Sequence, residues 1–220
     1  MRKNINLPVI RATIVLLVAV VAAFWGVQSA RRSQRITPSP STTRTAPDFQ
    51  LTNQDDHPVR LSNFPGKVKV ITFIYTSCPM RNMCPLATMN MQDLQASLGP
   101  KNEQVVLITI TFDPDKDSPR MLKQYGELYG ADFANWHFLT GTTFEVDTVC
   151  EEYGIIHERQ DDGTINHSMM TFLVDGDDRI RKFDVGNRWT AEELRTGVLS
   201  LVDELALRSE VTSVSSFPPS

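Results

Sequence analysis

The sequence predicts an α/β domain in which helices flank a layered, partly parallel sheet. Apolar runs alternate along the chain with stretches of helical spacing. Two of these runs, residues 68–75 and 105–111, hardly alternate with polar residues, which is typical of strands buried on both faces. The chain has 220 residues, 41% of them hydrophobic and 22% charged, and this suits one globular domain with tails.

The first half of the domain is predicted to contain a hairpin, two strands and two helices. In chain order they cover residues 49–51 with 59–61, then 68–75, 85–98, 105–111 and 118–130. Pro85 fits the first position of a helix, and Gly99 followed by Pro100 ends that helix. Ser118 followed by Pro119 opens the next one.

The second half adds a strand, a helix, a hairpin and a last helix. They cover residues 136–139, 142–153, 170–174 with 179–184, and 190–207. Two capping boxes, Thr142 with Glu145 and Thr190 with Glu193, mark the helix starts. This order of elements predicts a thioredoxin-like sheet with parallel crossovers and a C-terminal hairpin plus helix.

The N-terminal region predicts a transmembrane helix that precedes this domain. Residues 12–30 carry no charge and are mostly apolar, and basic residues flank both ends. A bilayer needs roughly 20 such residues. A secretory signal sequence is the alternative, but the apolar run is long for one, and Gln28 stands where cleavage needs a small residue.

The remaining boundaries follow from composition. Residues 1–11 become a cytoplasmic N-terminus, and residues 31–46, rich in Ser, Thr, Pro and Arg, form a flexible tether. Residues 209–220 are predicted to be a disordered tail, which leaves 47–208 as the folded domain. The net charge of -4 gives no basic footprint for nucleic acid.

Two thiols lie in the turn between the strand 68–75 and the helix that follows. Cys78 and Cys84 are separated by five residues, and prolines flank the run. Open α/β sheets place their ligands at the carboxyl ends of strands, and a helix start favours thiolate over thiol. A thiolate pair binds a soft metal or closes a disulfide, and simple core packing is disfavoured for clustered cysteines. Cys150 has helical spacing with Val146 and Val149, so we interpret it as a core residue.

His167 comes just before the strand 170–174, at a position that faces the cysteine turn in a thioredoxin-like sheet. A Cys2His ligand set suits Cu(I), Cu(II) or Zn(II), and a surface histidine is the alternative. His57, His137 and His157 show no partner pattern. Disulfide oxidoreductases of this fold carry a cis-proline at the start of this strand. The chain has no proline between positions 119 and 218, which counts against a general disulfide exchanger.

Two further features remain open at this point. The segment 113–119 is either a turn with a helix cap or a polar rim for the metal site or a docking partner. Met80 and Met83, between the thiols, carry soft thioethers, but solvent-facing or gap-filling roles are favoured.

These residues resemble the SCO/SenC family of thioredoxin-like copper-binding proteins, which assist assembly of the copper centre of cytochrome c oxidase. The resemblance spans about 47–204 and includes FQLTNQ (49–54), FIYTSCP (73–79), Cys84-Pro85, DP and DSP in 113–119, WHFLTG (136–141) and INHS (165–168). It implies a copper ion held by Cys78, Cys84 and His167, with no enzymatic turnover. It also implies a copper-accepting oxidase subunit, or another cuproprotein, as partner, and a membrane-anchored domain on the extracytoplasmic side.

The cysteine spacing departs from the family pattern. The family usually has three residues between the cysteines, and this chain has five. Either the extra residues loop out and copper binding survives with altered affinity, or the wider loop disfavours simultaneous ligation. In the second case the chain is a thiol-disulfide oxidoreductase that reduces a partner, with Cys78 and Cys84 as its redox pair. A peroxide-reducing domain is the weakest alternative, because Ile71 stands where that pattern has proline.

Overall fold

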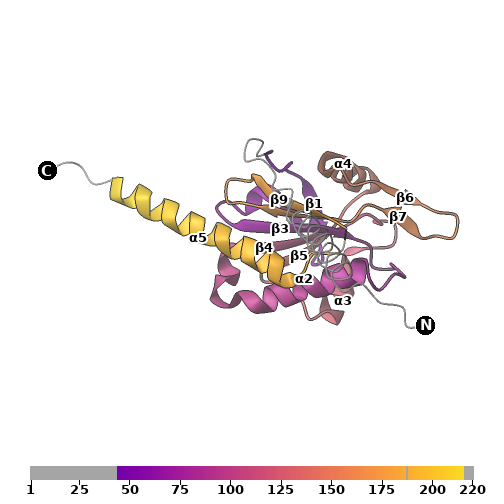
Figure 1. The fold of residues 1–220 in the computed structure, drawn as a ribbon. Coiled ribbons are helices and arrows are strands. Elements are labelled where there is room, and N and C mark those ends of the chain that lie inside the picture. The colour runs from indigo at the N-terminus through magenta and orange to yellow at the C-terminus, as the bar shows by residue number, and fades with distance from the viewer. Residues whose placement is uncertain (1–43, 187, 216–220) are drawn as a thin grey trace, which may run out of the picture. The chain divides into compact units, whose positions relative to one another are not determined.

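Figure 1 shows the computed structural model, which describes residues 44–186 and 188–215. Its helices and strands, in chain order, are β1 (Gln50–Asn53), β2 (Pro58–Arg60), η1 (Leu61–Asn63), β3 (Val68–Ile74), α2 (Cys84–Leu98), η2 (Gly99–Gln104), β4 (Val105–Thr111), α3 (Pro119–Leu128), β5 (Trp136–Thr140), α4 (Thr143–Tyr153), β6 (His157–Arg159), β7 (Ile165–His167), β8 (Met170–Val174), β9 (Ile180–Val185) and α5 (Ala191–Ser215). Seven strands form one sheet in the order β2-β1-β5-β4-β3-β8-β9, and β6 pairs with β7 in a separate two-stranded sheet.

The centre of the large sheet is parallel and fully covered. β3 pairs in parallel with β4, and β4 with β5, while β1 and β8 add antiparallel neighbours on the two sides. Every residue of β3 and β4 is buried, which confirms the prediction from their apolar runs. The carboxyl ends of these parallel strands therefore meet at one edge of the sheet.

Helices cover both faces of this sheet. Phe172 and Leu173 are successive residues of β8, so their side chains point to opposite faces. The ring of Tyr153 on α4 meets Phe172 with the ring centroids 5.2 Å apart. Gly197 on α5 lies against Leu173, and α5 also packs on α2. This is the predicted thioredoxin-like α/β architecture.

The predicted helix starts agree with the structure. Thr142 and Glu145 form the capping box of α4, in which the Glu145 amide donates to Thr142 Oγ1 at 3.3 Å. Thr190 and Glu193 exchange the same pair of bonds at the start of α5, at 3.0 and 3.2 Å. These boxes satisfy backbone N–H groups that a helix start leaves without partners.

One hairpin and two boundaries differ from the sequence prediction. The hairpin of β6 and β7 was not predicted. α5 continues to Ser215, beyond the predicted end at 207 and into the segment predicted as a disordered tail, because the sequence has no glycine or proline between that predicted end and Pro218. Residues 44–46 join the domain, since the Ala46 amide donates to the Asp178 carbonyl at 2.7 Å.

The predicted membrane helix and most of the predicted tether belong to a part of the chain that the structure does not describe. Residues 1–11, 12–30 and most of 31–46 lie outside the described residues. Between residues 44 and 215, with residue 187 left out, no helix combines the length and the apolar character that a bilayer crossing requires.

Candidate metal centre

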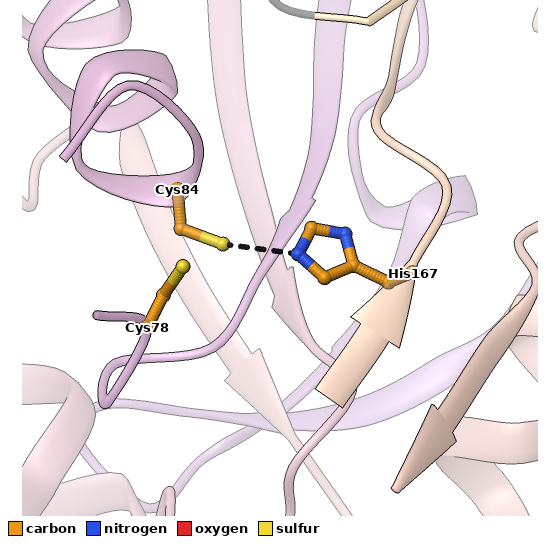
Figure 2. Close-up of side chains that lie close together, drawn as sticks. All are labelled: Cys78, Cys84 and His167. Carbon is orange, nitrogen blue, oxygen red and sulfur yellow. Dashed lines mark hydrogen bonds between the residues drawn. The ribbon is translucent and has the colours of Figure 1, made fainter. Parts of the chain in front are cut away.

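Two thiols and one imidazole converge at the edge where the parallel strands end. The Sγ atoms of Cys78 and Cys84 and a ring nitrogen of His167 all lie within 4.8 Å of one another. Figure 2 shows that the three side chains approach from different elements: the loop after β3, the first residue of α2, and the last residue of β7. The structure thus brings together all three residues that the sequence predicted as ligands.

A compact loop joins the two cysteines. The Cys78 amide donates to the Tyr75 carbonyl at 3.3 Å, which turns the chain directly after β3. A second turn is closed by the Met83 amide, which donates to the Met80 carbonyl at 3.0 Å, and its middle residues Arg81 and Asn82 are exposed. This second turn accommodates the wider cysteine spacing, so both sulfurs still face each other.

Cys84 is fixed from the helix side. It is the first residue of α2, with Pro85 next to it, and it is 0% exposed. Its carbonyl accepts from Thr88 Oγ1 at 3.0 Å, inside the first turn. The position follows from the sequence, because proline is well suited to the start of a helix and leaves the preceding thiol at the mouth of the turn.

His167 reaches the thiols from the small hairpin. Its Nε2 lies 3.7 Å from Cys84 Sγ (Figure 2). The imidazole packs against the ring of Phe112, with centroids 4.5 Å apart, and against the edge of Tyr75 at 5.7 Å. These aromatic neighbours hold the ring at the sheet edge, as the position before β8 predicted.

The two thiols differ in pKa. The interaction with the neighbouring Cys84 side chain lowers the pKa of Cys78 to about 5. The same interaction, together with burial, raises the pKa of Cys84. The sequence prediction that the helix start favours thiolate is therefore wrong for Cys84, where burial and the neighbouring sulfur outweigh the helix dipole.

This asymmetry predicts a pH profile for alkylation of the reduced protein. The rate at which iodoacetamide modifies Cys78 should rise with a midpoint near pH 5, because only the thiolate reacts and the pKa of Cys78 is about 5. Mass spectrometry of the peptide would give the rate. In Cys84→Ala the midpoint should move up toward that of an ordinary thiol. A midpoint above pH 7 in the protein without substitutions would contradict this assignment.

The other cysteine and histidines are not part of the cluster of ligand atoms. Cys150 is 1% exposed on α4, and burial raises its pKa to about 12, as expected of a core residue. Met80 is 42% exposed and Met83 packs against the core, which agrees with the solvent-facing and gap-filling roles favoured for them. His157 pairs with Asp147 at 3.3 Å, and His137 stacks on Phe64.

The sequence reasoning missed the residues that hold the site in place. Asp117 is fully buried and accepts from the backbone amide of Thr76 at 3.0 Å. Arg159 on β6 donates to the buried carboxylate of Asp113. The segment 113–119 had been noted, but only as a turn or a polar rim. The hairpin that carries Arg159 had one usable signal, the Asp162-Gly163 turn, in which Gly163 has φ +82°.

A thioredoxin-like domain with two thiols and an imidazole at this edge defines a class of metal-binding or thiol-redox proteins. The chain belongs to the SCO1/SenC family, whose model matches residues 37–202.

Individual relatives agree with this assignment. The chain is 32% identical over 140 residues to the SCO1 protein homolog of Bacillus subtilis, covering 61% of this chain and 70% of that protein. It resembles the structure of BsSco, described as a member of the Sco family of cytochrome c oxidase assembly proteins with a disulfide switch (29% identity, TM-score 0.64, 74% of this chain and 96% of the other). It also resembles Bradyrhizobium japonicum ScoI with copper bound (26% identity, TM-score 0.62, 72% and 99%).

Proposed function

We propose that the protein is a membrane-tethered copper chaperone that supports assembly of the copper centre of a respiratory cytochrome c oxidase. The observation that carries the proposal is the convergence of Cys78, Cys84 and His167 within 4.8 Å in a chain of the SCO1/SenC family. Family members described as oxidase assembly and copper-bound proteins support the choice of partner and cargo.

The donor set fits copper in both oxidation states. Cu(I) is soft and favours the two thiolates, while Cu(II) gains from the imidazole nitrogen. Both cysteines bind copper as thiolates, so copper uptake releases any proton that the pair holds and weakens as the pH falls. His167 Nε2 faces Cys84 Sγ, so the same nitrogen is placed to accept hydrogen bonds or metal.

The exposure of the ligands suggests a route for transfer. Cys84 is buried, whereas Cys78 is partly exposed in the loop. An incoming thiolate or imidazole of the acceptor protein therefore meets the Cys78 side of the site first. Copper leaves by stepwise ligand exchange, with the buried Cys84 released last.

Copper titration of the reduced protein tests the function. We expect one copper per chain, both as Cu(I) under anaerobic conditions and as Cu(II), with binding measured by competition against a chelator of known affinity. A fragment for this purpose should start no later than Arg44, because residues 44–46 bond to the domain. Absence of saturable copper binding by the folded, reduced protein would exclude the chaperone.

The alternative function is a thiol-disulfide reductase, and the thiol asymmetry favours it as a second candidate. The Cys78 thiolate attacks a partner disulfide, forming a mixed disulfide and releasing one partner thiolate. Cys84 then attacks Cys78, closes the Cys78–Cys84 disulfide and releases the second partner thiol, while its proton passes to the released thiolate. Turnover with a disulfide substrate and no copper would favour this role.

Membrane attachment is a separate prediction. We expect residues 12–30 to hold the full-length protein in the membrane fraction, through an alkaline carbonate wash, because an apolar helix of that length inserts stably. Protease added outside spheroplasts should digest the domain if it is extracytoplasmic. Recovery of the full-length chain in the soluble fraction without extraction would refute the anchor.

A further inference from the structure

We propose that the turn formed by residues 113–117 positions the two halves of the metal site, because it binds the cysteine loop through Asp117 and the histidine hairpin through Asp113. The proposal rests on the proposed function for its copper measurement, whereas its exchange measurement is independent of copper. Asp113, Asp117 and Arg159 are positioning residues in this view, not ligands.

The first arm of the turn holds the start of the cysteine loop. Asp117 Oδ2 accepts from the Thr76 backbone amide at 3.0 Å, and its other oxygen accepts from Thr76 Oγ1. Thr111 Oγ1 at the end of β4 also donates to Asp117, at 2.5 Å. A fully buried carboxylate with three donors is a strong fixed point, and Thr76 lies two residues before Cys78.

The second arm holds the hairpin that carries His167. Within residues 44–186 and 188–215, β6 and β7 pair only with each other, so no backbone ladder of this part of the chain joins them to the large sheet. The hairpin is instead tied down by side chains. Arg159 Nη2 on β6 donates to Asp113 Oδ1, and Asp113 is 0% exposed. The other oxygen, Asp113 Oδ2, has no hydrogen-bond partner among the described residues, so the buried charge depends on Arg159.

The turn itself is rigid enough to connect the two arms. The amides of Lys116 and Asp117 both donate to the Asp113 carbonyl, at 3.1 and 2.9 Å. The Asp113 amide donates to Thr111 Oγ1 at 3.0 Å, which attaches the turn to β4. The carboxylates at the two ends of the turn therefore keep a fixed separation. This separation in turn fixes the distance between the cysteine loop and the imidazole.

Two variants of the full-length protein separate the arms. Asp117→Asn keeps the volume but cannot accept from all three donors, and Arg159→Met keeps much of the aliphatic stem while removing the charge. Asp115→Asn is the matched control, because Asp115 lies on the same turn and is 69% exposed. Its ion pair with Arg159 is long, at 4.0 Å, and its hydrogen bond from Thr143 Oγ1 is exposed.

Amide hydrogen exchange of the reduced, copper-free protein gives the first measurement. We expect Asp117→Asn to accelerate exchange in residues 76–83 and Arg159→Met to accelerate it in residues 157–167, with no change in either segment for Asp115→Asn. Acceleration throughout the domain, or in neither segment, would overturn the proposal. This result holds whether or not the protein binds copper, so it is distinct from a failure of the proposed function.

Copper affinity gives the second measurement. Arg159→Met should lower the affinity for Cu(II) about ten- to a hundredfold, the usual effect of losing a residue that orients a ligand. It should lower the affinity for Cu(I) less, because both thiols stay in place. Asp117→Asn should lower the affinity for both ions.

Two further variants test the role of Arg159. Arg159→Lys should restore part of the Cu(II) affinity and of the electron paramagnetic resonance spectrum of bound Cu(II). The double variant Arg159→Met with Asp113→Asn should recover stability but not Cu(II) affinity. Equal Cu(I) and Cu(II) losses in Arg159→Met would contradict a role in placing His167.

Discussion

Replacing Cys84 with Ala should abolish both copper binding and disulfide formation while leaving the domain folded. Cys84 is a completely buried ligand candidate at the first position of α2, and its sulfur lies 3.7 Å from His167 Nε2. Loss of outer partners alone lowers metal affinity about 10–100-fold, so loss of a thiolate ligand should exceed about a hundredfold for both Cu(I) and Cu(II).

Cys150→Ala is the matched control for this variant. It also replaces a buried cysteine in a helix, but on α4, outside the cluster of ligand atoms. Both substitutions should lower the free energy of unfolding by about 1 kcal/mol, the typical effect of a buried truncation, and Cys150→Ala should keep one copper per chain. Copper loss in a folded Cys150→Ala protein, or full copper retention in Cys84→Ala, would contradict the assigned ligands. Chemical denaturation and chelator competition measure the two quantities.

The sequence predicted the parts of the fold that have strong local signals. The strands 68–75 and 105–111 were recognisable because an uninterrupted apolar run is the signature of a strand buried on both faces. Helix starts were recognisable because capping side chains act within three residues, as in Thr142 with Glu145. The cysteines and His167 followed from their places relative to these elements.

The supporting residues had no such signal. Asp117 and Thr76 are 41 residues apart, and Asp113 and Arg159 are 46 apart, so only the folded chain shows that they meet. β6 and β7 are three residues each, and β6 is His-Glu-Arg, so their pairing is too short and too polar to leave a clear period. The raised pKa of Cys84 also had no signal in the sequence, because burial depends on packing that the helix start does not reveal.

The cysteine spacing shows how a local departure can leave a site intact. The Met80–Met83 turn places Arg81 and Asn82 in solvent, and the two sulfurs remain within the 4.8 Å cluster. The alternative in which the wider loop prevents simultaneous ligation therefore loses its geometric basis. What the spacing changes is the loop itself, which has two residues more than the usual three-residue connection.

His167→Ala should lower the affinity for Cu(II) much more than the affinity for Cu(I). The copper and disulfide functions make different predictions for this variant. Two thiolates alone hold Cu(I) in a near-linear arrangement, so Cu(I) binding should weaken but persist. Cu(II) favours nitrogen-containing sites and should lose more than about a hundredfold in affinity, beyond the effect of an outer-shell change. A thiol-disulfide exchanger should slow only modestly, since the imidazole there can do no more than tune a thiolate.

The neighbouring imidazole supplies the control. His157 lies opposite His167 in the β6–β7 pair, and its ring stacks on Phe112 with centroids 5.8 Å apart, but it is not part of the ligand cluster. His157→Ala should therefore disturb the same aromatic packing without selective loss of Cu(II). Circular dichroism checks the fold of both variants, and chelator competition under anaerobic and aerobic conditions gives the two affinities.

If His157→Ala reproduced the selective Cu(II) loss, the effect would belong to the packing of the hairpin. If His167→Ala left both affinities unchanged while Cys78→Ala and Cys84→Ala abolished disulfide turnover, His167 would not be a copper ligand and the reductase would remain. Collapse of Cu(II) binding in His167→Ala alone, with the fold intact, is the result that the Cys2His assignment requires, because only that imidazole faces the thiols.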